Sequence, residues 1–370
     1  MRYYRDTWAD IDLDALQYNI KSLEKHHQKA LIAIIKANAY GHGDDMIAKK
    51  ALASGAKILA VSSLDEALSL RYKHIKGPIL VLGHVSPSDI HVAIAEKISV
   101  TVTSYAWAKA ILKEDLTGLV AHLKIDTGMN RMGLKTLEEV LEVLHDFDQA
   151  GVITEGLYTH FASSDDPKEI QTQAQYELFE AMFHKINRSF KWIHCSNSDA
   201  AIHFDTPLCN AVRIGLALFG YSSFEFDLKP VMTLKTKLVN VKTIQAGETV
   251  SYGATYTAPH TEIIATIPIG YADGWNRKHQ GDVCYIGDSA CEFIGRICMD
   301  QCMIRLDQLY PEGTEVELLG KKASIYPMSK HLETIPYEIL TQLSDRIPKV
   351  YLEKCKPINT INPRLIKKED

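Results

Sequence analysis

The 370-residue chain lacks the features that mark membrane, secreted and nucleic-acid-binding proteins. No apolar run approaches the roughly 18 residues that a membrane span needs. The net charge is -5, and neither a basic patch nor a basic tail is present, so nothing favours binding to nucleic acid or to an anionic membrane. The N-terminal segment MRYYRDTWADIDLDAL is polar from its start, unlike a secretory signal. We therefore expect a cytoplasmic protein with no nucleic-acid or membrane partner.

The cysteines follow no regular spacing. An odd number of cysteines without regular spacing fits reduced thiols in the cytosol better than a disulfide framework. Cys298 and Cys302 lie close together in RICMDQCM, but no CxxC motif or histidine pair accompanies them, so we expect no metal site. The seven cysteines are Cys195, Cys209, Cys284, Cys291, Cys298, Cys302 and Cys355.

The first 220 residues alternate between short apolar runs and amphipathic segments. Each run is rich in Val, Ile or Leu, as strands buried on both faces are. Segment 136–147 has apolar residues at helical spacing, and a further helix is expected from roughly Leu13 to His27. Eight strands alternating with helices predict a (β/α)8 barrel. The expected strands lie in 31–37, 58–63, 78–83, 98–104, 119–127, 153–162, 192–198 and 211–220.

The sequence pattern changes near residue 229, where the alternation of apolar runs and amphipathic segments ends. Short β-branched runs separated by Gly, Asp and Thr follow, with no long helix expected until about residue 335. The expected fold is therefore α/β: a (β/α)8 TIM barrel in residues 1–228, followed by a mostly-β C-terminal domain in residues 229–370. The sequence leaves open whether residues 1–10, which include the strand-like TWADID, pair with the second domain.

Polar residues gather where the barrel strands are expected to end, which is where active sites of this fold lie. In the stretch IAIIKANAYGHG, Lys36 follows a wholly apolar run. Desolvation there should lower the pKa of the amine and make it a nucleophile that can form a Schiff base with an aldehyde. A single lysine at a strand end is more often a solvated surface residue. The other polar residues expected at the same mouth are Tyr40, Lys124, Arg131, Tyr158, His160, His194, Asn197, Ser198 and Arg213.

Several longer motifs identify a family. The stretch AIIKANAYGHG resembles the cofactor-binding motif of the alanine racemases, which carry pyridoxal 5'-phosphate on a barrel followed by a β domain. The resemblance continues, in order and over nearly the whole chain, through HLKIDTGMNRMG, YTHFASSD, HCSNSDAA, VRIGLALFG, VSYGATYTA, IPIGYADGW, GRICMDQCM and LETIPYEIL. Together these blocks are far more specific than AYGHG alone.

The resemblance implies a role for each matching residue. Lys36 would bind the cofactor covalently and serve as one catalytic acid/base group, and Tyr252 would serve as the second, on the opposite face of the substrate. A free tyrosine has a pKa near 10, so neighbours such as His160 must help it to act as a base. Arg213 would face the pyridine nitrogen, where it cannot accept a proton and leaves the ring a weaker electron sink. The implied cofactor-binding residues are Lys36, Tyr40, Asn197, Ser198, Arg213, Gly215, Leu216 and Tyr337.

The resemblance also implies how substrate is bound. Arg131 and the backbone amide of Met299 would hold the substrate carboxylate, with Asp300 beside them. Lys124 matches a position that is carbamylated in many members of the family, where the modified side chain positions Arg131. Tyr252 would reach the active site of the other subunit in a head-to-tail homodimer. Bulky side chains are expected to narrow the entrance, namely Tyr256 and Tyr271.

These implications favour a racemase that interconverts L- and D-alanine and supplies D-alanine for peptidoglycan. One alternative is a racemase of broader specificity, acting for example on serine, on the same scaffold. A decarboxylase is disfavoured because the VSYG and RICMDQ blocks serve racemisation. A third alternative, a non-catalytic carrier of pyridoxal phosphate, is disfavoured because such carriers are single barrels without a second domain.

Overall fold

The structure, a computed structural model, describes residues 3–365. The chain forms two compact units that differ in how contiguous they are in sequence. The barrel unit contains Leu16–Ala39 and Asp44–Lys229, and the β unit contains Met1–Ala15, Tyr40–Gly43 and Pro230–Asp370. The short segment 40–43 thus belongs to the β unit although the chain before and after it belongs to the barrel unit. Of the N-terminal segment 1–10 considered above, residues 1 and 2 lie outside the described residues.

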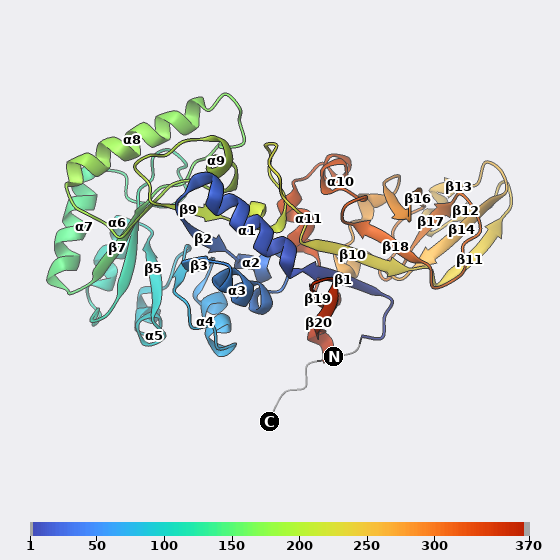
Figure 1. Cartoon of the computed structure of the whole chain (residues 1–370), viewed down its shortest axis with the longest axis horizontal. Helices are drawn as coiled ribbons and strands as arrows, with labels where there is room; N and C mark the ends of the chain where they lie inside the picture. Colours follow the sequence, from blue (N-terminus) through green and yellow to red (C-terminus); the bar gives the residue numbers. More distant parts are fainter. Residues whose placement is uncertain (1–2, 366–370) are drawn as a thin grey trace. The chain divides into compact units, whose positions relative to one another are not determined.

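The barrel unit contains a closed barrel of eight strands in sequence order, and each strand is parallel to the next (Figure 1). Their buried faces explain why the sequence shows continuous apolar runs here. The expected barrel followed by a mostly-β domain is confirmed. The strands are β2 (Ala30–Ile34), β3 (Ile58–Val61), β4 (Ile79–Val81), β5 (Ile98–Val102), β6 (Val120–Lys124), β7 (Ile153–Tyr158), β8 (Trp192–His194) and β9 (Ala211–Ile214).

Helices follow the barrel strands, and several begin at a side-chain cap. Ser63 and Ser104 cap α4 and α6, and Thr136 with Glu139 forms a capping box at α7. The helix expected from Leu13 to His27 is confirmed as α1. The helices are α1 (Leu13–His27), α2 (Lys36–Tyr40), α3 (Asp44–Ala53), α4 (Leu64–Tyr72), α5 (Ile90–Ala95), α6 (Tyr105–Ile111), α7 (Leu137–Gln149), α8 (Ile170–Ile186) and α9 (Ser198–His203).

Every expected run extends two to six residues past the end of its strand, and two of these differences concern site residues. The first strand ends at Ile34 rather than at Lys36, which instead opens α2. The run 211–220 is a strand only to Ile214, and Leu216–Phe219 form the short 3-10 helix η2. Burial on all sides makes a strand and a tight helical turn equally apolar, so composition does not separate them.

The β unit is built on a ten-stranded sheet with the order β11-β14-β17-β16-β15-β18-β10-β1-β19-β20. Strand β1 lies inside this sheet, antiparallel to β10 and parallel to β19. A separate hairpin, β12 with β13, carries the segment before and after Tyr252. The strands are β1 (Thr7–Asp12), β10 (Met232–Lys237), β11 (Asn240–Ile244), β12 (Thr249–Val250), β13 (Tyr256–Thr257), β14 (Glu262–Ile267), β15 (Val283–Ile286), β16 (Ser289–Ile294), β17 (Cys302–Leu306), β18 (Glu315–Leu319), β19 (Lys349–Glu353) and β20 (Lys356–Ile361).

Helices in the β unit come late in the sequence. α10 (Ile325–Leu332) begins about ten residues before the position expected for the first helix, and α11 (Pro336–Gln342) follows it. Proline at the first position of α11 suits a helix start, because its missing N–H would have no partner there. Within residues 3–365 no helix is both long and apolar enough to cross a membrane.

Candidate functional site

Lys36 stands at the start of a left-handed turn. Ala37, Asn38 and Ala39 all have φ and ψ near +50°, a conformation that non-glycine residues rarely adopt. Glu66 holds the turn by accepting a hydrogen bond from the Ala37 amide at 2.6 Å, while its other oxygen accepts from the Ser62 amide at 2.7 Å. Strain of this kind in a non-glycine segment is typical of functional sites.

The amine of Lys36 is held in an environment that disfavours its charge. The residue keeps solvent-accessible surface, yet protein atoms surround the amine closely enough that desolvation lowers its pKa. The Arg131 cation lowers this pKa further, and Glu66 opposes the shift. A lowered pKa raises the fraction of neutral amine, which is the nucleophilic form.

Lys124, the last residue of β6, is buried and carries a similarly perturbed amine. Burial first, and then the charges of Arg131 and Arg213, lower its pKa to about 8. The same cations also lower the pKa of His160, for which burial is again the largest cause. Lys36, Lys124, Arg131 and Arg213 therefore bring four cationic groups to one mouth, and such a concentration of positive charge favours an anionic ligand.

Arg213, on β9, is the most heavily hydrogen-bonded of these cations. Its two Nη nitrogens donate to three backbone carbonyls and to two imidazoles, all at 2.8 or 2.9 Å. The imidazoles are those of His194 and His160, and the carbonyls are those of Thr159, His194 and Cys195. Among the described residues, nothing accepts from its Nε–H. That donor is therefore the part of the guanidinium that is left for a ligand.

The loops after β8 and β9 meet at Ser198. Its hydroxyl accepts from the amides of Gly215 and Ala217 at 3.0 and 3.2 Å. Asn197 caps α9, because its side-chain oxygen accepts from the Ala200 amide at 3.1 Å, and it also accepts from the Ser164 hydroxyl. Leu216 opens η2 beside Gly215. The Gly215 and Ala217 amides are thereby occupied, whereas the described residues offer no acceptor for the Ser198 hydroxyl hydrogen or the Leu216 amide, and such donors at a turn suit phosphate.

Tyr40 and Tyr337 are brought together within the β unit. Their ring centroids lie 5.9 Å apart. Gly41 makes this approach possible, since a Cβ there would lie 2.3 Å from the Leu340 carbonyl oxygen of α11. The expected phosphate-binding tyrosines therefore share one neighbourhood, although nearly 300 residues separate them.

Tyr252 stands on an exposed, conformationally restricted turn of the β unit. It opens the 3-10 helix η3 (Tyr252–Ala254), and 72% of its surface is exposed. Gly253 has φ +75°, and a Cβ there would lie 2.8 Å from the Arg296 guanidinium. The Ser251 hydroxyl donates to the Arg296 carbonyl at 2.6 Å. Tyr252 and Cys298 help to line a cavity of about 380 Å³.

Backbone hydrogen bonds join the segment that contains Tyr271 to the segment that contains Met299 and Asp300. The amides of Tyr271 and Ala272 donate to the carbonyls of Cys298 and Met299, each at 3.0 Å. Met299 is 53% exposed and Tyr271 is 42% exposed. Tyr256, in contrast, already donates its hydroxyl to Glu262 at 2.5 Å, and its expected place at a substrate entrance stays a prediction.

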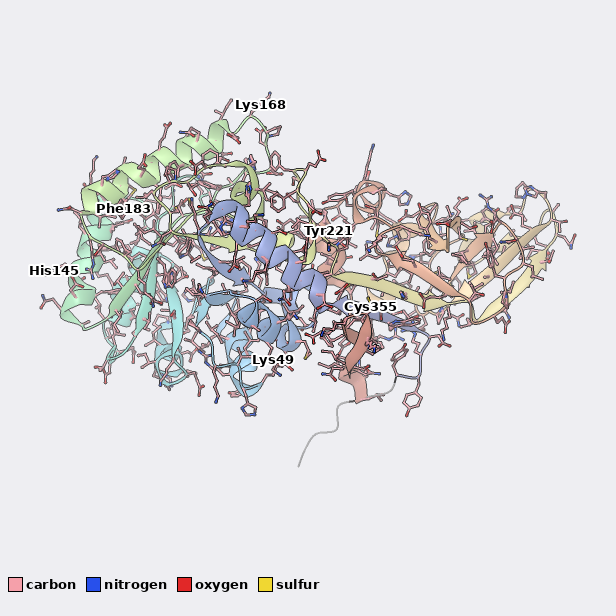
Figure 2. The ribbon with its side chains drawn as sticks, viewed as in Figure 1. Lys49, His145, Lys168, Phe183, Tyr221 and Cys355 are labelled. Carbon is pink, nitrogen blue, oxygen red and sulfur yellow. The ribbon has the colours of Figure 1, made fainter. Side chains whose placement is uncertain are left out.

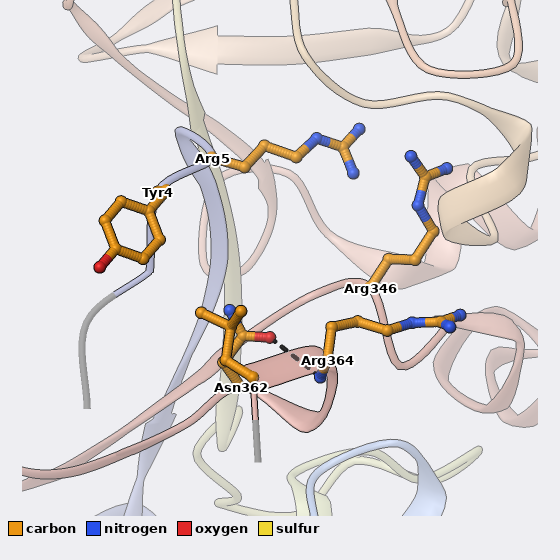
Figure 3. A pocket seen from close by; sticks show the side chains of 6 residues that line it. Tyr4, Arg5, Arg346, Asn362 and Arg364 are labelled. Carbon is orange, nitrogen blue, oxygen red and sulfur yellow. Dashed lines mark hydrogen bonds between the residues drawn. The ribbon is translucent and has the colours of Figure 1, made fainter. Parts of the chain in front are cut away.

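A buried carboxylate that the sequence did not reveal anchors these loops. Asp273 has no exposed surface and pairs with Arg5 at 2.5 Å and with Arg346 at 3.5 Å, while Arg346 also pairs with Asp300 at 2.7 Å. Arg5 and Arg346 extend along the wall of a cavity of about 460 Å³ that Arg364 also lines (Figure 3). The acidic partner of Arg5 lies 268 residues away, so no sequence pattern links the pair.

The barrel holds two further residues that sequence reasoning left without a role, His122 and His194. His122 lies two residues before Lys124 on the same strand, so both side chains lie on one face of it. His194 had been placed only at the end of a strand. The period of two from Lys124 is the signal that could have drawn attention to His122.

A lysine at the mouth of a (β/α)8 barrel, followed in the chain by a mostly-β unit, is the arrangement of a class of pyridoxal-phosphate-dependent enzymes that includes racemases. Comparison with known sequences narrows this class. Residues 11–223 match the alanine racemase N-terminal domain, and residues 231–351 match the alanine racemase C-terminal domain. The chain belongs to the alanine racemase family, whose members depend on pyridoxal phosphate.

Individual relatives span nearly the whole chain. Alanine racemase 1 of Bacillus subtilis is 43% identical, over 98% of this chain and 97% of that protein. The crystal structure of an alanine racemase from Bacillus anthracis superposes with a TM-score of 0.92 at 36% identity, covering 98% and 99% of the two chains. A histidine racemase from Leuconostoc mesenteroides has a TM-score of 0.88 at 27% identity, covering 95% and 99%. The match of both domains separates this chain from the single-barrel carriers.

Proposed function

We propose that this protein interconverts L- and D-alanine by moving a proton on opposite faces of the substrate α-carbon, with Lys36 and Tyr252 as the two acid/base groups. The observation that carries the proposal is the amine of Lys36, whose pKa is lowered at a mouth lined by further cations. Such an amine can both bind a carbonyl carbon and accept a proton near neutral pH.

The residues at the barrel mouth fit pyridoxal phosphate. When bound, the cofactor supplies a conjugated ring that stabilises negative charge on the α-carbon. The Nε–H of Arg213 would donate to the pyridine nitrogen and leave it unprotonated. Phosphate would be held by donors from several loops, namely Tyr40, Ser198, Leu216 and Tyr337. Gly215, whose amide donates to the Ser198 hydroxyl, would allow close approach, and Asn197 orders the start of α9.

Substrate would be held by charge and by a backbone amide. Arg131 and the Met299 amide would bind the carboxylate, with Asp300 beside them. Lys124 as a cation would repel Arg131, whereas its carbamylated form would carry the opposite charge and position that guanidinium. A pKa of about 8 leaves roughly a tenth of the Lys124 amine neutral at pH 7, and the neutral amine is the form that reacts with CO2.

We further propose that the active enzyme is a head-to-tail homodimer in which each Tyr252 serves the other subunit's barrel. The exposure of Tyr252, Met299 and Tyr271 supports this arrangement, because three large side chains on neighbouring loops rarely stay in water without a partner surface. The proposed cellular role is cytoplasmic supply of D-alanine for peptidoglycan. Deletion of the gene should then make growth depend on added D-alanine, unless another racemase replaces it.

Incubation with L-alanine in D2O tests the reaction. The expected product is D-alanine with deuterium at the α-carbon. In Tyr252→Phe, racemisation should fall by about 10²-fold or more, as expected for loss of a positioned acid/base group. One enantiomer should still exchange its α-proton, because Lys36 remains. Tyr72→Phe is the matched control, since Tyr72 is 73% exposed and lies in the barrel unit. Exchange of both enantiomers in Tyr252→Phe would exclude the two-base assignment.

A racemase with another substrate, or with several, is the second candidate. The histidine racemase at 27% identity supports it, since a similar fold there serves a different amino acid. Competition among alanine, serine and histidine in the same D2O assay separates the two candidates. Preferential turnover of alanine supports the proposal, and faster turnover of either other amino acid would replace it.

A further inference from the structure

A row of hydrogen bonds runs through the barrel from Arg213 to the surface. Arg213 Nη1 lies 2.8 Å from His194 Nδ1, and His194 Nε2 lies 3.0 Å from His122 Nδ1. His122 Nε2 lies 3.3 Å from Glu155 Oε1, and Glu155 Oε2 pairs with Lys191 at 3.1 Å. Both histidines are fully buried, whereas Lys191 is largely exposed.

The chemistry of arginine fixes the direction of every bond in this row. A guanidinium can only donate, so His194 Nδ1 must be an acceptor without a proton. Neutral His194 then carries its proton on Nε2 and donates it to His122 Nδ1. His122 in turn must carry its proton on Nε2 and donate it to the Glu155 carboxylate. Burial is the largest cause of a lowered pKa for both histidines, which agrees with two neutral rings.

The same argument fixes the imidazole at the other end of the guanidinium. Arg213 Nη2 donates to His160 Nδ1 at 2.9 Å, so neutral His160 must carry its proton on Nε2. Among the described residues, nothing accepts from that nitrogen. His160 therefore has an N–H left for a ligand or for an acceptor on another chain.

Packing holds the rings of the row in place. Tyr158 stacks on His194 with ring centroids 4.7 Å apart and an interplanar angle of 16°. His122 lies against Gly156 of β7, where a Cβ would come within 2.1 Å of its Nδ1. The strand pairing shifts at this point, between Ala121 and His122. Only glycine leaves room for the ring, so the site is shaped for this imidazole.

We propose that His122 and Glu155 are positioning residues that act on the reaction through Arg213, because they reinforce from the far end of the row the His194 tautomer that Arg213 requires. Glu155 accepts from His122, which leaves Nδ1 of His122 as the acceptor for His194 and Nδ1 of His194 as the acceptor for Arg213. Carboxylates orient metal-binding histidines in the same way. The tautomers follow from the geometry alone, whereas their effect on racemisation rests on the proposed function.

Nitrogen NMR of the full chain labelled with 15N-histidine tests the tautomers directly. We expect His122, His194 and His160 to be neutral, with the proton on Nε2, and the signals can be assigned by single substitutions. A proton on Nδ1 of His194 or His122 would overturn the inference, whatever the activity. Absence of alanine racemisation combined with the expected tautomers would overturn the proposed function and leave the row intact.

Three substitutions separate positioning from a merely structural role. In Glu155→Leu, His122 loses its acceptor, so the His194 signals should shift toward a mixture of tautomers and kcat should fall roughly 10-fold with little change in KM. Glu155→Gln keeps a carbonyl oxygen and should restore the tautomer and most of kcat. His145→Phe, on the outer side of α7, is the control for histidine assignment (Figure 2).

Gly156→Ala is a second way to disturb His122, because the added methyl displaces its ring while Glu155 stays unchanged. It should reproduce the tautomer change of Glu155→Leu. If Glu155→Leu lowers thermal stability but leaves both the His194 tautomer and kcat unchanged, the two residues only support the fold and the inference is wrong.

Discussion

The two units carry their candidate site residues in opposite ways. In the barrel, the perturbed groups stand at strand ends and are fixed by bonds to backbone and to one another, as Arg213 is by five acceptors. In the β unit, Tyr252 and Met299 stand on loops and are exposed. Their order comes from the backbone beneath them rather than from bonds made by their own side chains. The barrel therefore holds its charged groups in fixed positions, whereas the β unit exposes its candidate side chains to solvent.

The two units thus meet two different physical demands. Groups whose pKa must be shifted need burial and neighbouring charges, which strand ends inside a barrel provide. A group that serves another chain must remain accessible, so its position can be secured only through its loop. In the β unit, Asp273 orders such loops. It accepts from the Gly270 amide next to Tyr271, and it pairs with Arg346, which also pairs with Asp300.

The strongest test of the barrel half is Lys36→Ala. Racemisation should fall by about 10³-fold or more, because the cofactor loses its covalent link and one acid/base group is lost. Borohydride reduction followed by peptide mass mapping should locate pyridoxal on Lys36 in the parent protein and nowhere in the variant. Lys49→Ala, on α3, is the control (Figure 2). Activity within tenfold of the parent would refute the role of Lys36.

The β half is tested by Asp273→Asn. Removing the charge leaves Arg5 and Arg346 without their buried partner, so the free energy of unfolding should fall by about 3 kcal/mol. Urea denaturation measures this change. Asp345→Asn breaks the exposed pair with Arg364 and should cost less than about 1 kcal/mol. Equal losses in the two variants would mean that burial of Asp273 contributes nothing.

A smaller effect should appear in the pH dependence of stability through Lys124. Its pKa is about 8 in the folded chain, below the ordinary 10.5, so between these values the unfolded chain binds more protons. The free energy of unfolding should therefore rise with pH across this window, relative to Lys124→Met, by about 2 kcal/mol. Urea titrations of the cofactor-free, uncarbamylated proteins at pH 7 and pH 10 measure the difference. A constant difference between the two proteins would contradict the shifted pKa.

The features that depend on local sequence pattern were predicted from the sequence. Eight apolar runs sufficed for the barrel, because buried parallel strands are apolar on both faces. The apolar run before Lys36 made it a candidate, and the family motif that contains it supplied the predicted role. The left-handed turn at 37–39 was not predicted, since alanine and asparagine give no sign of a positive φ.

What depends on distant contacts could not be predicted. His122 and His194 are separated by 72 residues and meet only because β6, β7 and β8 are adjacent in the barrel. Asp273 and Arg5 meet only through the order of strands in the β unit. Neither charge nor spacing signals such pairs in a single sequence. The family motifs supplied roles for residues near the ligand but none for the residues behind them.

The fixed direction of the hydrogen bonds from Arg213 to Glu155 has a consequence for proton transfer. A proton can hop along a line of imidazoles only if each ring can take one at one nitrogen while releasing one at the other. Here the first member never accepts, and reversing either ring would break two contacts in a dry interior. The row therefore works as an insulator rather than a wire, and it offers no path by which a proton at Arg213 could reach Glu155.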